Sequence, residues 1–233
     1  MKLQVDPSIW DRFPGLHIGV LEVRGMDNRG LDEGILHLIR ERQRRIREEI
    51  SVDTLSQHPK IAAWRNAYST FGAKPKKHAS SVENLYRMTL KGIDLRHINK
   101  VVDAYNCISL KHMVPVGGDD ASRVEGDIRL TVAEGNEPFR PLHAADEETA
   151  RAGEIIYRDD REVLCRRWNW RECDKTKMSE STTDVVLVVE GLPPVSRGDI
   201  ELILSDLKAL VIKSCGGSSI SAVLDRNSTS LIV

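Results

Sequence analysis

The chain has 233 residues, with 34 Lys and Arg against 35 Asp and Glu, 40% hydrophobic residues and 5% aromatic residues. A chain of this size can bury a core without disulfides or a structural metal, and no apolar run approaches the roughly 20 residues of a membrane span. The net charge of −1 argues against a uniformly basic nucleic-acid binder, and the first seven residues lack the apolar segment of a signal peptide. We expect a cytoplasmic protein that does not bind a membrane.

The sequence motifs that hold cofactors and metals are missing. There is no P-loop, no H-E-x-x-H pair, no nucleophile elbow and no dinucleotide-binding fingerprint. The four cysteines are irregularly spaced and form no C-x-x-C pair: Cys107, Cys165, Cys173 and Cys215. We therefore expect no cofactor, no metal and four reduced thiols.

The first predicted elements are a strand and a long helix. Residues 16–21 alternate as a strand does and run into turn residues from Gly25 to Gly30. Apolar residues then recur at helical spacing from Leu31 to Ile50, which leaves a run of arginines on the solvent side. That run fits either a solvated face paired with glutamates or a contact to an RNA backbone. The candidates for RNA contact are Arg44 and Arg45.

Two shorter predicted helices flank a basic loop. Pro59 fits the first turn of a helix that ends at Gly72, and Ser80 or Ser81 can cap a second helix that ends at Gly92. Between these helices lie three lysines: Lys74, Lys76 and Lys77. Because the beginning of a helix offers free amide donors to an anion, these lysines could hold a phosphate.

The second half of the chain is predicted to be mainly strands. A helix begins near Ile98 and stops before Pro115, and short alternating runs follow at 127–132, 154–157, 163–170 and 185–189, with a hairpin turn at 159–160. A last helix over 199–214 precedes a closing strand pair. Helices followed by strands predict an α+β fold. We expect one domain, in which residues 1–52 form an N-terminal extension packed on residues 53–233.

One polar segment covers residues 106–120. Gly117 and Gly118 permit close backbone approach and are followed at once by Asp119 and Asp120. The pattern fits either a functional loop or a helix-ending turn with solvated aspartates.

A second polar segment covers residues 164–177. As a strand it would place Arg167 and Asn169 on one face. Trp168 and Trp170 on the other face either pack in the core or stack on a base. Beyond the strand, three residues could orient a water and bind an anion: Asp174, Thr176 and Lys177.

Across these segments the sequence resembles the B3/B4 domain of the phenylalanyl-tRNA synthetase beta subunit, in a stand-alone form. The matching stretches lie at 64–68 (WRNAY), 72–77 (GAKPKK), 80–85 (SSVENL), 98–106 (INKVVDAYN), 115–120 (PVGGDD), 126–128 (GDI) and 165–171 (CRRWNWR). The resemblance implies an α+β domain with a mixed or antiparallel sheet and packed helices. The synthetase domain hydrolyses tRNA that carries the wrong amino acid, so the resemblance implies an aminoacylated tRNA partner and an ester hydrolase that edits in trans.

Two positions depart from the pattern of the bacterial synthetases. Gly117 stands where their editing pocket carries a histidine, and their pocket glutamate falls near Asp174. The substrate therefore cannot be copied from the synthetase, which removes tyrosine. Some stand-alone members look specialised for canavanine, an arginine mimic, on an arginine tRNA. Acidic residues would suit its cationic group: Asp119, Asp120 and Asp127.

An aminoacyl ester is already activated, so the enzyme needs to hold the terminal adenosine, position a water and stabilise an oxyanion. We expect water or amino-group positioning, the catalytic role, from Asn169, Asp174 and Thr176. We expect oxyanion contact from the amides of Gly117 and Gly118, and contact with the adenosine or the carbonyl oxygen from Arg167 and Lys177. The tRNA backbone is expected to meet Lys74, Lys76 and Lys77, with Arg44 and Arg45 second.

Two other functions stay open at this point. A chain that kept the fold and lost the activity would be a non-catalytic tRNA-binding or interaction module, and the missing pocket histidine is a reason to consider it. An enzyme that acts on a free small molecule would not bind tRNA. Hydrolysis of mischarged tRNA separates these possibilities.

Overall fold

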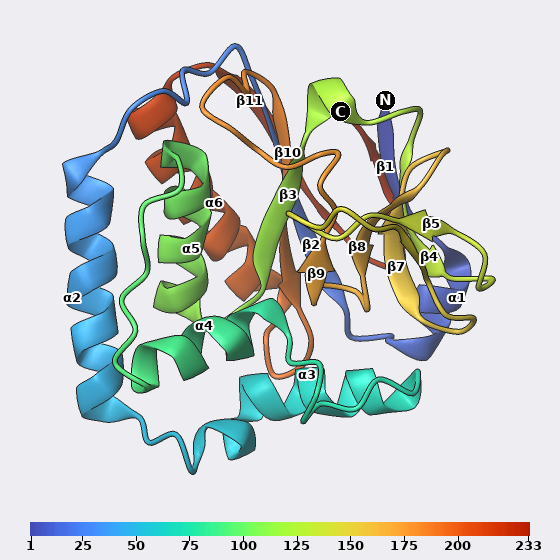
Figure 1. Cartoon of the computed structure of the whole chain (residues 1–233), viewed down its shortest axis with the longest axis horizontal. Coiled ribbons are helices and arrows are strands. Elements are labelled where there is room, and N and C mark those ends of the chain that lie inside the picture. The colour runs from blue at the N-terminus through green and yellow to red at the C-terminus, as the bar shows by residue number, and fades with distance from the viewer.

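Two β-sheets lie side by side at the centre of the molecule, in a computed structural model that describes all 233 residues (Figure 1). The four-stranded sheet is antiparallel, in the order β11 (Ser218–Leu224), β2 (His17–Arg24), β10 (Val185–Gly191) and β3 (Val116–Asp120). The six-stranded sheet has the order β12 (Ser230–Ile232), β1 (Lys2–Val5), β4 (Ile128–Val132), β7 (Ile155–Arg158), β8 (Val163–Arg166) and β9 (Arg171–Glu172). Only β1 and β4 run parallel. A separate pair joins β5 (Pro138–Phe139) and β6 (Glu148–Thr149).

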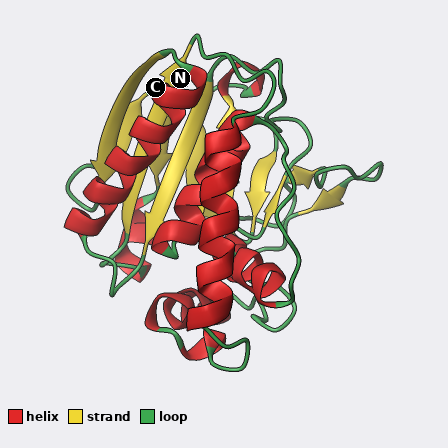
Figure 2. Ribbon diagram, turned by 90° about the vertical axis from the view of Figure 1, so that its left-hand side faces the viewer, coloured by secondary structure: helices red, strands yellow, loops and turns green.

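Six α-helices cover these sheets unevenly. They are α1 (Pro7–Arg12), α2 (Glu33–Glu49), α3 (Pro59–Thr70), α4 (Ser81–Leu90), α5 (Lys100–His112) and α6 (Arg197–Cys215), with short 3₁₀ turns at Leu55–Gln57 and Ala121–Arg123. α5 and α6 pack on the four-stranded sheet, and α2 packs on the outside of α5. Figure 2 shows these long helices in front of the strands. None of the helices is long and apolar enough to cross a bilayer.

The α+β class predicted from the sequence is confirmed, and the helices follow their expected caps. The Asp32 carboxylate accepts from the amides of Gly34 and Ile35 at the start of α2, and the Ser80 hydroxyl accepts from the Glu83 amide at the start of α4. A side chain that satisfies a free first-turn donor fixes where a helix begins. Short-range chemistry therefore determined these boundaries.

Three predicted features differ in the structure. The strand expected over 163–170 ends at Arg166, because Arg167 and Trp168 both take left-handed backbone angles, with φ of 48° and 69°. Asp119 and Asp120 belong to strand β3 and are buried, so they are not solvated turn residues. The closing strand pair is split, since β11 joins the four-stranded sheet and β12 joins the six-stranded sheet.

The first 52 residues supply an interior strand to each sheet. β1 lies between β12 and β4, and β2 lies between β11 and β10. Their side chains belong to the core, since Leu3, Ile18 and Leu21 are at most 1% exposed. This segment is therefore more than an outer layer, and the boundary expected at residue 52 stays a prediction.

Candidate functional site

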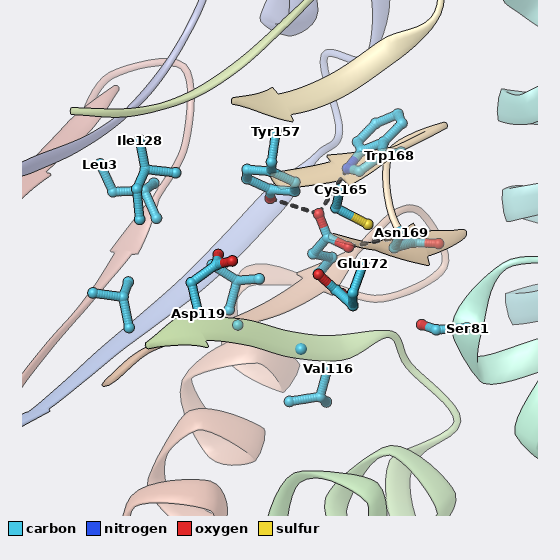
Figure 3. Close-up of a pocket in the computed structure, with 15 residues that line it drawn as sticks. Leu3, Ser81, Val116, Asp119, Ile128, Tyr157, Cys165, Trp168, Asn169 and Glu172 are labelled. Carbon is cyan, nitrogen blue, oxygen red and sulfur yellow. Dashed lines mark hydrogen bonds between the residues drawn. The ribbon is translucent and has the colours of Figure 1, made fainter. Parts of the chain in front are cut away.

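A small chamber lies between the two sheets (Figure 3). β3 and β10 form one wall, strands of the six-stranded sheet form the other, and Ser81 at the start of α4 closes one side. The volume of about 30 Å³ has room for about two water molecules. Three carboxylates line it, Asp119, Glu172 and Glu190, and no Lys or Arg does. The chamber is therefore acidic and lacks a built-in counter-ion.

Glu190 is a buried carboxylate with three neutral donors. β10 alternates, so Glu190 shares the chamber face with Val186 and Val188. Its oxygens accept from Tyr157 Oη at 2.6 Å, Trp168 Nε1 at 2.7 Å and Asn169 Nδ2 at 2.8 Å; these bonds are dashed in Figure 3. Burial raises the pKa of Glu190, and the three donors oppose that rise. Glu190 is therefore firmly fixed in place.

Asp119 is buried with a single donor. The Thr176 hydroxyl donates to its Oδ1 at 2.5 Å. Burial raises the pKa of Asp119 to about 6, while the Thr176 bond and the Lys175 ammonium lower it. That ammonium lies 2.7 Å from Asp159 Oδ2 and 3.0 Å from Glu125 Oε1, so it is already neutralised. A cation that enters the chamber would find Asp119 without an ion-pair partner of its own.

Glu172 lies at the mouth of the chamber. It comes from the short strand β9, opposite Cys165 on β8, and it lines both the chamber and an outer pocket. Burial raises the pKa of Glu172 well above its ordinary value, and the Asp119 carboxylate raises it further. A carboxyl group whose pKa is raised is a stronger base when it is ionised, which suits it to acid–base chemistry.

The outer pocket continues from the chamber. Its volume is about 200 Å³, and it shares Gly118 and Glu172 with the chamber. Its other lining residues are Ile98, residues of α5 and residues of the segments at 142–143 and 173–178. Tyr105, Thr176 and Lys177 add polar groups to this wall. A ligand in the outer pocket would therefore reach Glu172 at the boundary with the chamber.

The two glycines of β3 differ in how their amides are used. β3 is the edge strand of its sheet, and Ala121 N–H donates to the Asp184 carbonyl on the β10 side. In an antiparallel ladder, amides alternate between the two edges of a strand. The amide of Gly117 therefore faces β10, while that of Gly118 faces the open edge, as does Asp120 N–H, which donates to the Thr176 carbonyl at 2.9 Å. Only the Gly118 amide is placed to donate to a ligand.

The turn at 167–170 carries two chamber residues. It connects β8 to β9, with Arg166 paired to Arg171. Left-handed backbone angles cost free energy for residues such as Arg167 and Trp168. Packing of the side chains against the core stabilises these angles. Trp168 is fully buried, with edge-on ring contacts to Phe13 at 4.8 Å and to Trp64 at 5.0 Å. The strained turn directs Trp168 Nε1 and Asn169 Nδ2 toward Glu190.

The three expected catalytic residues have different positions. Asn169 spans two partners, accepting from Tyr68 Oη at 2.7 Å and donating to Glu190, so both ends of its amide are engaged. Thr176 holds Asp119 and lines the outer pocket. Asp174 lines neither cavity, because its carboxylate accepts from Lys177 Nζ at 2.8 Å and from the His143 amide at 3.1 Å. Glu172 is the carboxylate in the position expected for Asp174.

Of the three expected acidic contacts, Asp119 alone lines the chamber. Asp120 is buried and accepts from Ser122 and from Thr182 Oγ1 at 2.6 Å. Asp127 accepts from the Lys2 amide at 2.9 Å. These two carboxylates hold the local backbone and lie outside both cavities.

The two expected cationic contacts are also separated. Arg167 is 6% exposed; its guanidinium pairs with Glu154 at 2.9 Å and lies 4.5 Å from the centre of the Trp170 ring. Lys177 is exposed on the wall of the outer pocket. Lys177 can therefore reach a ligand there, whereas the Arg167 guanidinium is engaged by Glu154 and Trp170.

The expected tRNA contacts fall in two places. Lys76 and Lys77 line a groove beside α4, and Lys74 is exposed next to it. Arg44 and Arg45 lie on α2, the outermost helix (Figure 1). Arg44 pairs with Glu48 at 2.8 Å and Glu41 at 3.5 Å, as on a solvated helix face. Their roles toward RNA stay predictions.

Two chamber carboxylates were missed by the reasoning from sequence. Glu190 follows five apolar strand residues, and a charge at an inward position of a buried strand was a sign that could have been used. Glu172 gave no such sign, because the turn before it breaks the alternation on which the prediction relied. Nowhere in the chain do three His, Cys, Asp or Glu side chains group so that they could hold a metal ion.

Comparison with known proteins gives the family. The model of the B3/4 domain matches residues 63–206, more than half of the chain. Among solved structures, the chain is similar to an N-terminal fragment of the phenylalanyl-tRNA synthetase beta subunit from Pyrococcus horikoshii, with a TM-score of 0.47 and 14% identity, covering 95% of this chain and 53% of that one. The chain thus spans about half the length of that fragment, and no curated protein matches it. The chain belongs to the B3/4 domain family.

Proposed function

We propose that this protein hydrolyses the ester of a mischarged aminoacyl-tRNA in trans. The observation that carries the proposal is the acidic chamber, in which Asp119, Glu172 and Glu190 meet without a lining cation. Burying carboxylates without counter-ions costs stability, and perturbed groups in a cavity are typical of functional sites. The α-ammonium group of an aminoacyl ester is a cation that such a chamber would attract.

The chemistry requires few groups, because the ester is already activated. A water oxygen attacks the ester carbonyl carbon and gives a proton to the ionised form of Glu172, which its raised pKa makes a stronger base than an ordinary carboxylate. The Gly118 amide on the open edge of β3 donates to the oxyanion. The bond from the carbonyl carbon to the ribose oxygen then breaks, and Glu172 returns the proton to the ribose oxygen as it leaves.

The charge of the chamber favours an amino acid with a cationic side chain. An arginine mimic such as canavanine carries a planar group that can donate to two carboxylates. Gly117 leaves Glu172 Oε1 uncrowded on the side of β3, because a Cβ at this position would stand 3.3 Å from that oxygen. Another non-cognate amino acid would rely on its α-ammonium group alone.

The test is a deacylation screen over tRNAs charged with non-cognate amino acids, canavanine included. Two carboxylates that are two residues apart supply a test variant and a matched control: Glu172 lies at the chamber mouth and Asp174 lies outside the chamber. We expect Glu172→Gln to lower turnover by about 10²–10⁴-fold, the usual contribution of a general base. We expect Asp174→Asn to lower it by less than about tenfold. Equal losses, or a loss confined to Asp174→Asn, would contradict the role of Glu172.

The alternative is a non-catalytic tRNA-binding or interaction module. The small size of the chamber, about 30 Å³, favours it, since ligand pockets usually reach several hundred Å³. Binding of uncharged tRNA with no hydrolysis of any charged tRNA would support this second function.

A further inference from the structure

A basic groove runs along α4, on the other side of the turn at 167–170 from the chamber. It measures about 580 Å³, and no Asp or Glu lines it. Its cations come from α3, the loop after it and α4: Arg65, Lys76, Lys77, Arg87 and Lys91. In a chain of net charge −1, five cations around one groove attract a polyanion.

Two of these cations are fixed by a buried acid. Glu83 is fully buried, and its Oε1 accepts from Arg65 Nη1 at 2.7 Å, Arg87 Nε at 2.8 Å and Arg87 Nη2 at 2.7 Å. One carboxylate thus holds two guanidinium groups, which leaves the triad with a net positive charge. Arg65 and Arg87 stay 21% and 35% exposed. Their outer N–H groups are therefore held ready for an anion.

The three lysines of the groove are free. Lys76, Lys77 and Lys91 are exposed, and none of them forms an ion pair. Flexible ammonium groups beside fixed guanidinium groups suit phosphates spaced along a chain more than a single compact anion.

The groove and the chamber share their dividing wall. Asn169 and Ser81 line the chamber, while their neighbours Trp170 and Ala79 line the groove. The Ser81 amide donates to the Asn169 carbonyl at 3.1 Å, which joins the start of α4 to the turn. One ligand could therefore place phosphates in the groove and its end near the chamber.

We propose that this basic groove binds the phosphate backbone of RNA, in the stretch that leads to the aminoacylated end. The inference rests on the proposed function for the choice of RNA among polyanions, because only an RNA would carry an ester to the adjacent chamber. It assigns RNA contacts to Arg65, Arg87 and Lys91, with Glu83 as the positioning residue.

The experiment measures binding of uncharged tRNA by fluorescence anisotropy at several salt concentrations. The test variant is Lys76→Gln/Lys77→Gln/Lys91→Gln, which removes three exposed and unpaired charges. The matched control is Arg40→Gln/Lys208→Gln/Lys213→Gln, which removes three exposed and unpaired charges from α2 and α6. We expect the groove variant to weaken binding at least tenfold and to lower the salt slope by about 2, at about 0.7 per phosphate of a single strand. The control should change binding by less than about twofold.

The outcomes separate this inference from the proposed function. Equal weakening in both triple variants, or no weakening in the groove variant, overturns the groove while deacylation can persist. A specific loss of binding in the groove variant supports the groove, even if no charged tRNA is hydrolysed and the deacylase is thereby excluded. Loss of binding to a sulfated polysaccharide together with unchanged binding to tRNA would also overturn it.

Discussion

Asp119 and Glu190 line the same chamber and are held in different ways. Glu190 uses both oxygens to accept from three buried donors. Asp119 receives one bond, from a hydroxyl that can rotate. Removing an acceptor is costly when fixed donors are left unpaired and cheap when they are not. Glu190 therefore supports the fold of the chamber, while Asp119 remains available to a ligand.

Neutralising each of these acids should change stability in opposite directions. The pKa of Asp119 is raised from 3.8 to about 6, so the folded state binds more protons than the unfolded state between these values. Stability therefore falls as pH rises through that window. Asp119→Asn removes this cost, and we expect it to raise the free energy of unfolding by up to about 3 kcal/mol at pH 8 and by much less at pH 4.

Glu190→Gln should instead destabilise the protein by about 1–3 kcal/mol. Its new NH₂ group would meet the Asn169 NH₂ group, whose oxygen is held by Tyr68. Urea unfolding at pH 4 and pH 8 measures both variants. A gain for Asp119→Asn that does not grow with pH, or a stable Glu190→Gln, would contradict this account.

The sequence was informative about side chains only where neighbours in the chain decide their environment. Ser80 as a helix cap could be predicted because its partner is three residues away. Glu190 could not, because its donors come from residues 157, 168 and 169. Glu172 lines the chamber and Asp174 does not for the same reason, since the turn at 167–170 decides which side chains face inward.

At the scale of elements, β3 shows why its two glycines are not equivalent. A Cβ on Gly118 would stand 2.2 Å from the Val186 carbonyl oxygen and 2.8 Å from Leu187 Cα, on the partner strand β10. A Cβ on Gly117 would meet only Glu172 Oε1, at 3.3 Å. Gly118 is thus needed for the strands to pair closely, whereas Gly117 shapes the chamber.

The two alanine variants should separate folding from function. Gly118→Ala forces backbone atoms apart, so we expect a loss of roughly 1–3 kcal/mol or more. Gly117→Ala should keep the stability within about 1 kcal/mol and lower turnover, because its methyl group crowds Glu172. Thermal unfolding and deacylation rates report the two effects. A destabilised Gly117→Ala together with a tolerated Gly118→Ala would refute this assignment of the two glycines.

Helices were predicted well and the turn at 167–170 was not. Apolar spacing and capping residues are local, so the sequence placed the starts of α3 and α4 within a residue or two. The left-handed turn contains no glycine and no Asn-Gly pair, the usual signs of such a turn. It is held by ring contacts with Phe13 and Trp64, which are far away in sequence.

At the scale of the molecule, the near-zero net charge hides a separation of charge. The chamber holds three carboxylates, and the groove behind the turn holds five cations. Fields from such clusters act over a Debye length of about 8 Å at physiological salt, so each site keeps its own sign. A polyanion with a cationic group at its end matches this arrangement, which is the charge pattern of an aminoacylated RNA.

The last prediction concerns residues 53–233, the segment expected to form the B3/B4-like domain. Without residues 1–52 it lacks β1 and β2. β2 pairs with both β11 and β10, and β1 pairs with both β12 and β4, so each of these four strands loses a neighbour. Loss of an interior strand exposes apolar side chains and unpaired backbone groups on both sides. We therefore expect the fragment to show no cooperative urea transition, with the full chain as the control.

Adding residues 1–52 as a separate peptide tests the same point in reverse. If these strands complete the two sheets, the mixture should recover strand content by circular dichroism and a cooperative transition, because the missing contacts are non-covalent. Since the m-value scales with the surface exposed on unfolding, the restored complex should have an m-value close to that of the full chain. A fragment 53–233 that unfolds cooperatively by itself, with an m-value in proportion to its length, would show that residues 1–52 are an extension after all.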